Sequence, residues 1–354
     1  MTASIKKRDS NMELARIVAM AMIMVGHFFS HGLGSASQPS PNDMVLLDWN
    51  TSVILAIRAI CTGGVSLFML ISGFYGIKLR WKSVISFFLL CVFYNGVAYF
   101  VNTPFENITV KGILDIFLIS RTNHWFFKGY WWILLTSPIL NLALNRFSLR
   151  SLRVLEAMAL VLITVSSCIL GNPQGNTALF LYCLYFTGGY LRKETLFNDL
   201  SKKSLVLIWA IIKILMIACS IVVYNVFHKE YGILLQNNSP FVILTAVTLF
   251  MFFRKVNISS SFVNGWASTI VACLFIQDVI FCDYLYACIG GAYASNGLSA
   301  VFFASIAALV AAIFIAAFLI EWPRKYVAGK IASFLAPKFS KIVDIETSIL
   351  KESV

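Results

Sequence analysis

Charged residues are scarce in this chain of 354 amino acids. Asp, Glu, Lys and Arg together make up 12% of the sequence and hydrophobic residues 59%, and the mean hydropathy is +0.81. A soluble globular domain carries about 25% charged residues, so the composition excludes that class of protein. No long polar interval separates the apolar stretches between residues 12 and 320. We therefore predict one polytopic membrane domain without an appended soluble domain.

Several motifs of soluble enzymes are also missing. The sequence contains no Gly-rich phosphate loop, no Gly-x-Ser-x-Gly elbow and no metalloprotease His-Glu pair. Most of the eight cysteines lie within apolar runs, where an unpaired thiol behaves as a small hydrophobe. His31 follows His27 by four residues, but no third metal ligand is visible. We therefore predict neither a disulfide framework, nor a metal site, nor a bound cofactor.

Ten windows can be drawn to cross about 30 Å of hydrocarbon. Eight of them are long and apolar: 12–30, 53–77, 83–101, 125–144, 153–171, 204–227, 266–289 and 298–320. Two shorter ones, 178–191 and 239–253, complete the set. The segment 110–119 has helical spacing but is too short to span, so we expect an interfacial or re-entrant helix there. The prediction is an all-α membrane protein with about ten transmembrane helices.

The distribution of Lys and Arg supports this count. With the N-terminus inside, 21 of the 28 cations fall in inner segments, and only Lys111, Arg121 and Lys229 fall in outer loops. This asymmetry is a strong positive-inside signal. Removing either short window would invert the sides of the intervening loops and remove the asymmetry. We therefore predict that both termini are cytoplasmic. The net charge of +12 then requires no nucleic acid as a partner.

Two ionisable residues lie inside the first window, and charge within a bilayer usually serves a function. Arg16 and His27 are eleven residues apart, which advances a helix by about 16 Å and leaves both side chains on one face. Glu13 falls on that face too. The alternative is a snorkelling arginine beside an ordinary buried histidine, and the segment alone does not separate the two.

Two clusters near the window boundaries each have two interpretations. The cations after the second window are either positive-inside anchors or a pocket for the phosphates of coenzyme A: Lys78, Arg80 and Lys82. The residues that open the fourth window belong either to an interfacial aromatic belt or to a platform that binds sugar rings: His124, Trp125 and Tyr130.

The last two windows also contain buried charge. We predict that Asp278 either pairs with Arg58 or takes a catalytic role. Glu321 and Arg324 have the spacing of an ion pair, which we expect at the end of the last transmembrane helix.

Several segments resemble those of the acyltransferase family 3 membrane proteins. Residues 11–20, running on to His27, resemble that family's N-terminal signature, and residues 67–74 resemble the end of its second helix. Trp125, Phe126 and Tyr130, followed by residues 138–141, resemble its mid-chain pattern. The resemblance covers about residues 8–330. It implies a transmembrane acyltransferase domain over residues 1–337 and a cytoplasmic tail over residues 338–354.

Members of this family move acyl groups, commonly acetyl from cytoplasmic acetyl-CoA, onto hydroxyls of cell-surface glycans or their lipid-linked precursors. The resemblance therefore implies a glycan O-acetyltransferase of the bacterial cytoplasmic membrane, with acetyl-CoA, a glycan acceptor and membrane lipids as partners. It maps the family's essential histidine onto His27 and its first-helix arginine onto Arg16. The family's basic pair fits the three cations at 78–82 poorly, and Gln277 stands where many relatives carry a histidine.

The predicted mechanism follows from these residues. We expect His27 to act as general base or acyl carrier, because imidazole is suited to proton transfer near neutral pH. Arg16, with Glu13 beside it, is expected to stabilise the oxyanion or to hold coenzyme A. The same buried charges also fit a proton-coupled transporter or lipid-linked glycan flippase, or a scaffold in a polysaccharide assembly complex. Coenzyme A binding distinguishes an acyltransferase from a flippase, since a flippase has no use for coenzyme A.

Overall fold

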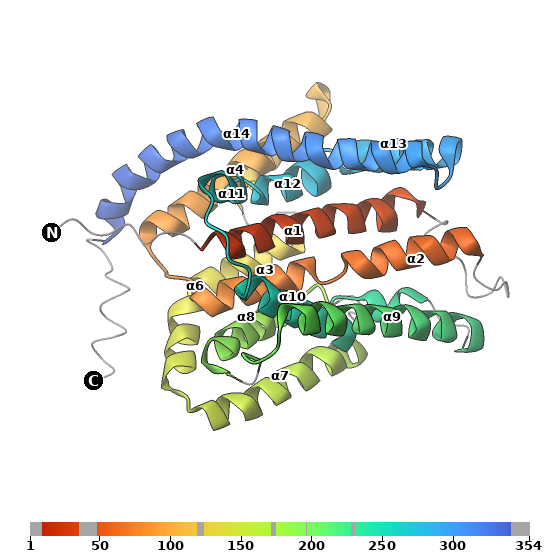
Figure 1. Ribbon diagram of the computed structural model, residues 1–354. Helices are drawn as coiled ribbons and strands as arrows, with labels where there is room; N and C mark the ends of the chain where they lie inside the picture. The colour runs from red at the N-terminus through yellow and green to blue at the C-terminus, as the bar shows by residue number, and fades with distance from the viewer. Residues whose placement is uncertain are drawn as a thin grey trace.

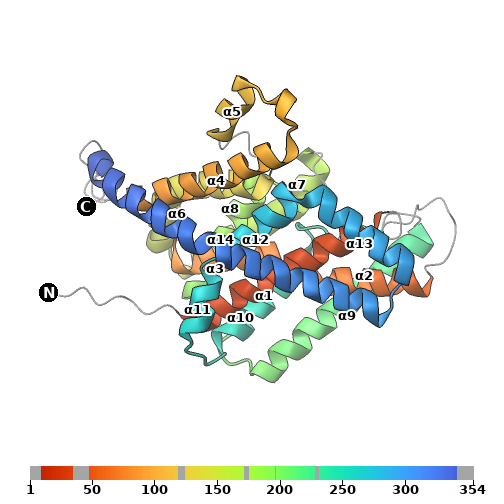
Figure 2. The same ribbon diagram turned by 90° about the horizontal axis from the view of Figure 1, so that it is seen from above.

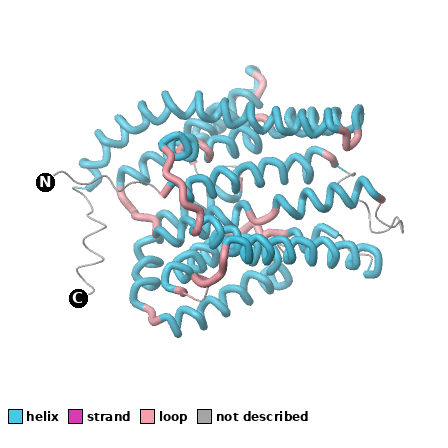
Figure 3. Tube along the Cα trace, in the orientation of Figure 1, coloured by secondary structure: helices cyan, strands magenta, loops and turns pink. Residues whose placement is uncertain are grey.

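The computed structural model describes residues 9–34, 48–118, 124–170, 175–195, 197–227 and 231–340. All regular elements in these ranges are helices, so the all-α prediction is confirmed (Figure 3). Seven stretches are long and apolar enough to cross a membrane: Ser10–Gly32, Trp49–Tyr75, Trp81–Asn102, Lys202–Phe227, Gly232–Arg254, Ser261–Ile280 and Ala300–Phe339. These helices support a multi-pass membrane protein, while the count of about ten and the cytoplasmic side of the termini stay predictions.

The first half of the described chain contains α1 (Ser10–His27), η1 (Phe28–Gly32), α2 (Trp49–Cys61), α3 (Gly64–Tyr75), α4 (Trp81–Asn102), η4 (Phe105–Asn107), α5 (Val110–Ile116), α6 (Trp125–Arg146) and α7 (Leu149–Leu170). The second half contains α8 (Ala178–Lys193), α9 (Lys202–Phe227), η6 (Tyr231–Leu235), α10 (Pro240–Arg254), α11 (Ser261–Ala267), α12 (Val271–Phe275), η7 (Ile276–Ile280), α13 (Cys282–Asn296) and α14 (Ala300–Ser340).

Helix α1 lies inside the bundle and packs against α2, α3, α10, α11, α12 and α14 (Figure 1). Met24 of α1 and Phe28, the first residue of η1, are fully buried in the main hydrophobic core. The start of α1 and the end of α14 lie at the same end of the bundle (Figure 1). The short helix predicted within 110–119 is α5, which stands apart from the other helices (Figure 2).

Three of the ten predicted windows form helices that are not among the seven candidate spans. They are 125–144, 153–171 and 178–191, which correspond to α6, α7 and α8. Helix α8 packs against α3, α6 and α7, and its 16 residues make it short for a span. Burial against neighbouring helices therefore accounts for α8 without a requirement that it cross the bilayer.

The second predicted window is two helices joined by a break. Helix α2 begins where Asp48 accepts a hydrogen bond from the backbone N–H of Thr51. The Thr51 side chain and backbone N–H hold the pKa of Asp48 below its usual range. The helix ends at Cys61, since Thr62 is extended and Gly63 has a left-handed φ of 94°. A Cβ on Gly64 would lie 2.6 Å from the Ala19 carbonyl oxygen, so glycine lets α3 start against α1.

The last two windows differ from prediction. Residues 266–289 do not form one helix, because the chain passes through α11, α12, the π-helical η7 and α13. The last helix does not end near residue 320. Helix α14 continues through Pro323 and Pro337 to Ser340 and curves across the bundle (Figure 1), so the predicted tail boundary at 338 falls within it.

Candidate active site

A cavity of about 860 Å³ follows α1 through the bundle. Glu13 and Arg16 line it near the start of α1, and His27 and His31 line it near the end. The prediction that Arg16 and His27 share one face of the first helix is therefore confirmed. The volume lies within the range of about 300–1,000 Å³ that small-molecule sites occupy.

At the end of the cavity near the start of α1, Arg16 makes an ion pair with Glu13. The Arg16 Nη1 donates a hydrogen bond of 2.8 Å to the Glu13 Oε1, and Glu13 is buried. Phe68 and Ser72 of α3 line the same end. A guanidinium with five donors keeps hydrogen-bonding capacity beyond one carboxylate oxygen, so Arg16 can also bind an anionic or carbonyl group in the cavity.

At the other end, the carboxylate of Asp278 lies among three side chains. His124 Nε2 is 2.8 Å from Asp278 Oδ2, and the Tyr286 hydroxyl donates a hydrogen bond of 2.7 Å to Oδ1. His27 Nδ1 is 3.6 Å from the same Oδ1. One carboxylate therefore connects α6, α13 and the end of α1.

The position of His124 at the start of α6 determines which of its nitrogens faces Asp278. His124 is the N-cap residue of α6, and its Nδ1 accepts a hydrogen bond from the backbone N–H of Phe126. An imidazole nitrogen that accepts a hydrogen bond carries no proton, so the other nitrogen, Nε2, is the donor. His124 therefore donates its Nε2–H to the Asp278 carboxylate and holds it in place.

His27 is close to Asp278 but not hydrogen-bonded to it. The separation of 3.6 Å exceeds hydrogen-bond length, and the buried Nδ1 has no hydrogen-bond partner among the described residues. Buried polar atoms without a partner are uncommon. The Gln277 Nε2 donates to the Met24 carbonyl at 3.0 Å, which ties η7 to α1 one turn before His27. His27 Nδ1 therefore faces the Asp278 carboxylate at a distance that a small movement of either side chain would reduce to a hydrogen bond.

Both sides of this contact are built on π-helical turns. His27 is the last residue of α1 before η1, and Asp278 lies in η7. Single π-turns are rare and occur often at functional sites, because the extra residue redirects the side chains around it. His27 and Asp278 therefore meet where two such turns lie side by side.

The aromatic residues that open α6 divide between the cavity and the outer surface. Trp125 and Tyr130 line the cavity together with His124, whereas the Trp132 side chain is 57% exposed. Buried Phe127 stacks on Phe275 with a centroid separation of 3.9 Å, which anchors the start of α6 beside η7. The three predicted substrate-binding residues therefore share the cavity of His27, and their role in binding stays a prediction.

The predicted cofactor-binding cations lie elsewhere. Lys78, Arg80 and Lys82 are exposed at the connection from α3 to α4 and are not among the described residues that line the cavity. The connection follows Tyr75, whose hydroxyl donates a hydrogen bond of 2.6 Å to Asp9 Oδ2 at the start of α1. The three cations therefore lie at the same end of the bundle as Arg16, on the surface.

Sequence reasoning left open the partners of Asp278, either Arg58 or catalytic groups. The carboxylate receives hydrogen bonds from His124 and Tyr286, and Arg58 lines the same cavity. No local spacing indicates these contacts, because His27, His124 and Asp278 belong to segments far apart in the sequence. A carboxylate beside His27 favours the catalytic alternative.

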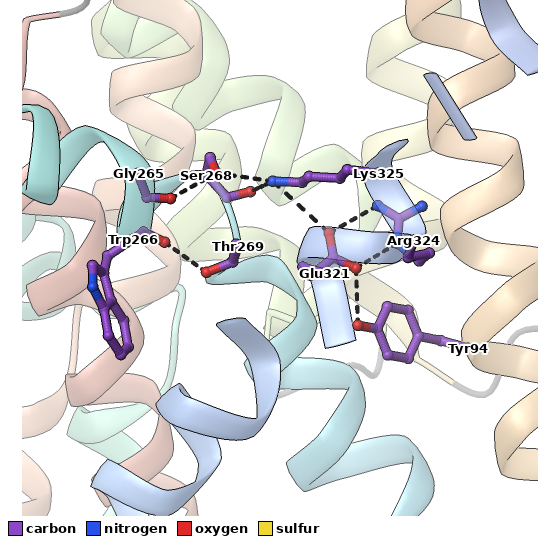
Figure 4. A network of polar contacts seen from close by, with 8 residues as sticks. All are labelled: Tyr94, Gly265, Trp266, Ser268, Thr269, Glu321, Arg324 and Lys325. Atoms are coloured by element: carbon purple, nitrogen blue, oxygen red, sulfur yellow. Dashed lines mark hydrogen bonds and ion pairs between the residues drawn. The ribbon is translucent and has the colours of Figure 1, made fainter. Parts of the chain in front are cut away.

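The predicted ion pair of Glu321 and Arg324 is present, but not at a helix end. Both residues lie inside α14, where Arg324 Nη2 donates a hydrogen bond of 2.8 Å to Glu321 Oε2. The hydroxyl of Tyr94 donates to Glu321 Oε1 at 2.9 Å, and Lys325 Nζ binds the hydroxyl of Ser268 at 3.0 Å and its backbone carbonyl (Figure 4). Ser268 lines the cavity, so this network joins α14 and α4 to the cavity wall.

A family model described as an acyltransferase domain, that of acyltransferase family 3, matches residues 9–327. The chain belongs to this family. No curated protein and no solved structure gives a significant match. The match covers nearly the whole chain and includes every residue of the site described above. The apolar helices and the family together make this chain a multi-pass membrane acyltransferase.

Proposed function

We propose that this acyltransferase moves an acetyl group from cytoplasmic acetyl-CoA to a hydroxyl of a cell-surface polysaccharide or its lipid-linked precursor. It would work in the cytoplasmic membrane of a bacterium. The observation that carries the proposal is one cavity that holds Arg16 at one end and His27, with the Asp278 carboxylate beside it, at the other. A donor and an acceptor that enter from opposite ends would meet there.

His27 acts as the general base in this proposal. With Nδ1–H directed toward Asp278, Nε2 is the nitrogen that remains for the substrate, as in the pairing of base and carboxylate in hydrolase triads. His27 Nε2 removes the proton of the acceptor hydroxyl as its oxygen bonds to the thioester carbonyl carbon. The carbon–sulfur bond then breaks, and the departing coenzyme A thiolate takes the proton back from His27.

A second route uses His27 as an acyl carrier. Its Nε2 would bond to the thioester carbonyl carbon while the carbon–sulfur bond breaks and coenzyme A leaves as the thiolate. The acceptor oxygen would then take the acetyl group from Nε2, and the freed Nε2 would take up the hydroxyl proton and pass it to solvent. The carboxylate of Asp278 favours both routes, because it stabilises positive charge that develops on the imidazole ring. Single-turnover reactions separate the two, since only the carrier route releases coenzyme A before an acceptor is added.

Arg16 binds the acetyl-CoA donor in this proposal. A helix advances about 1.5 Å per residue, so the eleven residues between Arg16 and His27 correspond to about 16 Å, a reach that suits an extended pantetheine arm. Glu13 orients the guanidinium through their hydrogen bond of 2.8 Å. The exposed cations Lys78, Arg80 and Lys82 lie at the surface of the same end, where they would meet the phosphates of coenzyme A.

The acceptor occupies the half of the cavity near His27. Trp125 supplies an aromatic face for a sugar ring beside His124, and Tyr130, which lies near Arg16, continues the aromatic wall of the cavity toward the donor end. Amide side chains complete this end, with Asn237 Nδ2 donating a hydrogen bond of 2.8 Å to Asn176 Oδ1. Aromatic rings together with paired amides suit a ligand that is rich in hydroxyl groups.

The test uses membranes that contain the protein, radiolabelled acetyl-CoA, and lipid-linked and surface glycans from the host. Wild type is compared with His27→Ala and with Trp132→Ala, an exposed aromatic variant outside the cavity lining. We expect base-labile label on glycan with wild type and Trp132→Ala but not with His27→Ala. Wild-type transfer by His27→Ala would refute the mechanism. No transfer by any variant, together with no coenzyme A binding, would favour the transporter or flippase.

A further inference from the structure

Lys213 is a buried cation near the middle of a candidate membrane span. It lies halfway along α9, which runs from Lys202 to Phe227, and only 3% of its surface is exposed. A charge at that depth is costly unless it has partners and is usually functional. Lys213 is not among the described residues that line the cavity, so the proposed reaction gives it no role.

Three oxygen atoms at the C-terminal end of α2 accept hydrogen bonds from the ammonium group of Lys213. Its Nζ lies 2.7 Å from the Ala59 carbonyl oxygen, 3.2 Å from the Thr62 carbonyl oxygen and 2.8 Å from the Thr62 hydroxyl. An ammonium has three N–H donors. The number of acceptors therefore equals the number of donors.

These acceptors belong to the break between α2 and α3. A helix that ends leaves carbonyl oxygens without partners and a partial negative charge, and water is not available to satisfy them in the hydrocarbon region. The Thr62 hydroxyl satisfies part of this need by donating a hydrogen bond of 2.8 Å to the Ala59 carbonyl. Lys213 adds a donor to the Ala59 carbonyl, donates to the Thr62 carbonyl, and brings the opposite charge.

The break is also a wall of the cavity. Cys61, Thr62, Gly63 and Gly64 all line it. The wall lies against the residue before His27, because a Cβ built on Gly26 would be 3.5 Å from the Cβ of Cys61. A change in the break therefore alters the space next to the proposed base.

We propose that Lys213 is a positioning residue, which holds the α2–α3 break in place from behind and so maintains the cavity wall beside His27. It acts through Thr62 and Cys61 and does not touch the substrates. The effect on transfer rests on the proposed function. The geometry of the break is independent of the proposed function. The alkylation rate of Cys61 therefore tests the inference separately.

The experiment compares Lys213→Met with Lys203→Met, which removes an exposed lysine from the same helix. Methionine keeps the length and apolar stem of lysine but donates no hydrogen bond. Alkylation of Cys61 in native membranes is followed by mass spectrometry, and kcat and KM are measured for acetyl-CoA. In Lys213→Met we expect alkylation of Cys61 to change about tenfold and kcat to fall about tenfold, with little change in KM for acetyl-CoA. Lys203→Met should match wild type.

A second pair of variants covers the case in which Lys213→Met does not accumulate in membranes. Thr62→Ser keeps the hydroxyl that binds Lys213, whereas Thr62→Val has a similar shape and removes it. Thr62→Val should shift the Cys61 reactivity in the same direction as Lys213→Met, and Thr62→Ser should restore the wild-type value. Wild-type reactivity in Lys213→Met, or equal reactivity in the two Thr62 variants, would overturn the inference. If wild type transfers no acetyl group, the proposed function fails and the Cys61 result still stands.

Discussion

The imidazole of His124 lies 2.8 Å from the carboxylate of Asp278, and this contact determines how His27 is presented. The Phe126 backbone N–H binds the Nδ1 of His124, which leaves Nε2–H for the carboxylate. Held in this way, the carboxylate faces the Nδ1 of His27 at 3.6 Å. The sequence leaves the partners of Asp278 open, and the structure places its carboxylate at the centre of the site.

Replacing Asp278 by Asn should lower kcat by about a hundredfold or more. The amide keeps the size of the side chain but removes the charge that stabilises a protonated imidazole, and general base catalysis is worth about 10²–10⁴-fold. Initial rates with saturating acetyl-CoA give kcat, and KM for acetyl-CoA should stay close to wild type because Arg16 is far from the change. A kcat within twofold of wild type would remove Asp278 from the mechanism.

Replacing Arg16 by Gln should weaken coenzyme A binding by about tenfold. The change removes a charged donor from the cavity and leaves the buried Glu13 carboxylate without its 2.8 Å ion pair, and a charged hydrogen bond contributes about 1.5–3 kcal/mol. Calorimetry with purified protein measures the Kd of coenzyme A. The matched variant Arg80→Gln, at the exposed cation cluster, tells whether the surface contributes as well. An unchanged Kd of coenzyme A in Arg16→Gln would show that coenzyme A does not bind at Arg16.

Replacing Gly64 by Ala should destabilise the protein by about 1–3 kcal/mol, the usual cost of overpacking. The new Cβ would lie 2.6 Å from the backbone carbonyl of Ala19, and a backbone atom cannot rotate away as a side chain does. Gly329→Ala is the control, because nothing lies within 4 Å of a Cβ there and alanine favours the helix. Thermal unfolding in detergent should show a lower Tm for Gly64→Ala alone, and equal Tm values would contradict the close packing of α3 on α1.

Replacing Tyr94 by Phe should cost about 1–3 kcal/mol of stability, since the buried Glu321 carboxylate loses a donor. Tyr326→Phe removes an exposed hydroxyl from the same long helix that carries Glu321 and should be neutral. The comparison uses the thermal unfolding of both variants. A Tyr94→Phe protein as stable as Tyr326→Phe would show that Arg324 and Lys325 satisfy Glu321 without the Tyr94 hydroxyl.

The local features of this protein follow from its sequence. Sparse charge and long apolar runs are sufficient to predict a helical membrane protein, because the bilayer requires backbone polar groups to be satisfied within each segment. The helical repeat is sufficient to place Arg16 and His27 on one face, since that relation depends only on residue spacing. The segments at 11–27 and 67–74 were likewise sufficient to indicate the family that the match to residues 9–327 confirms.

Only the tertiary structure decides what depends on contacts between distant segments. Asp278 could have taken several partners, and the packing of η7 against α1 and the start of α6 brings it to His27 and His124. The breaks at Thr62 and after η7 were not predicted, because the windows 53–77 and 266–289 are long and apolar enough overall to be drawn as single spans. At the first break Lys213 of a neighbouring helix donates to the Ala59 carbonyl, a contact that spacing does not reveal. Residue spacing therefore determined the face on which His27 lies, and packing between helices determined its partners.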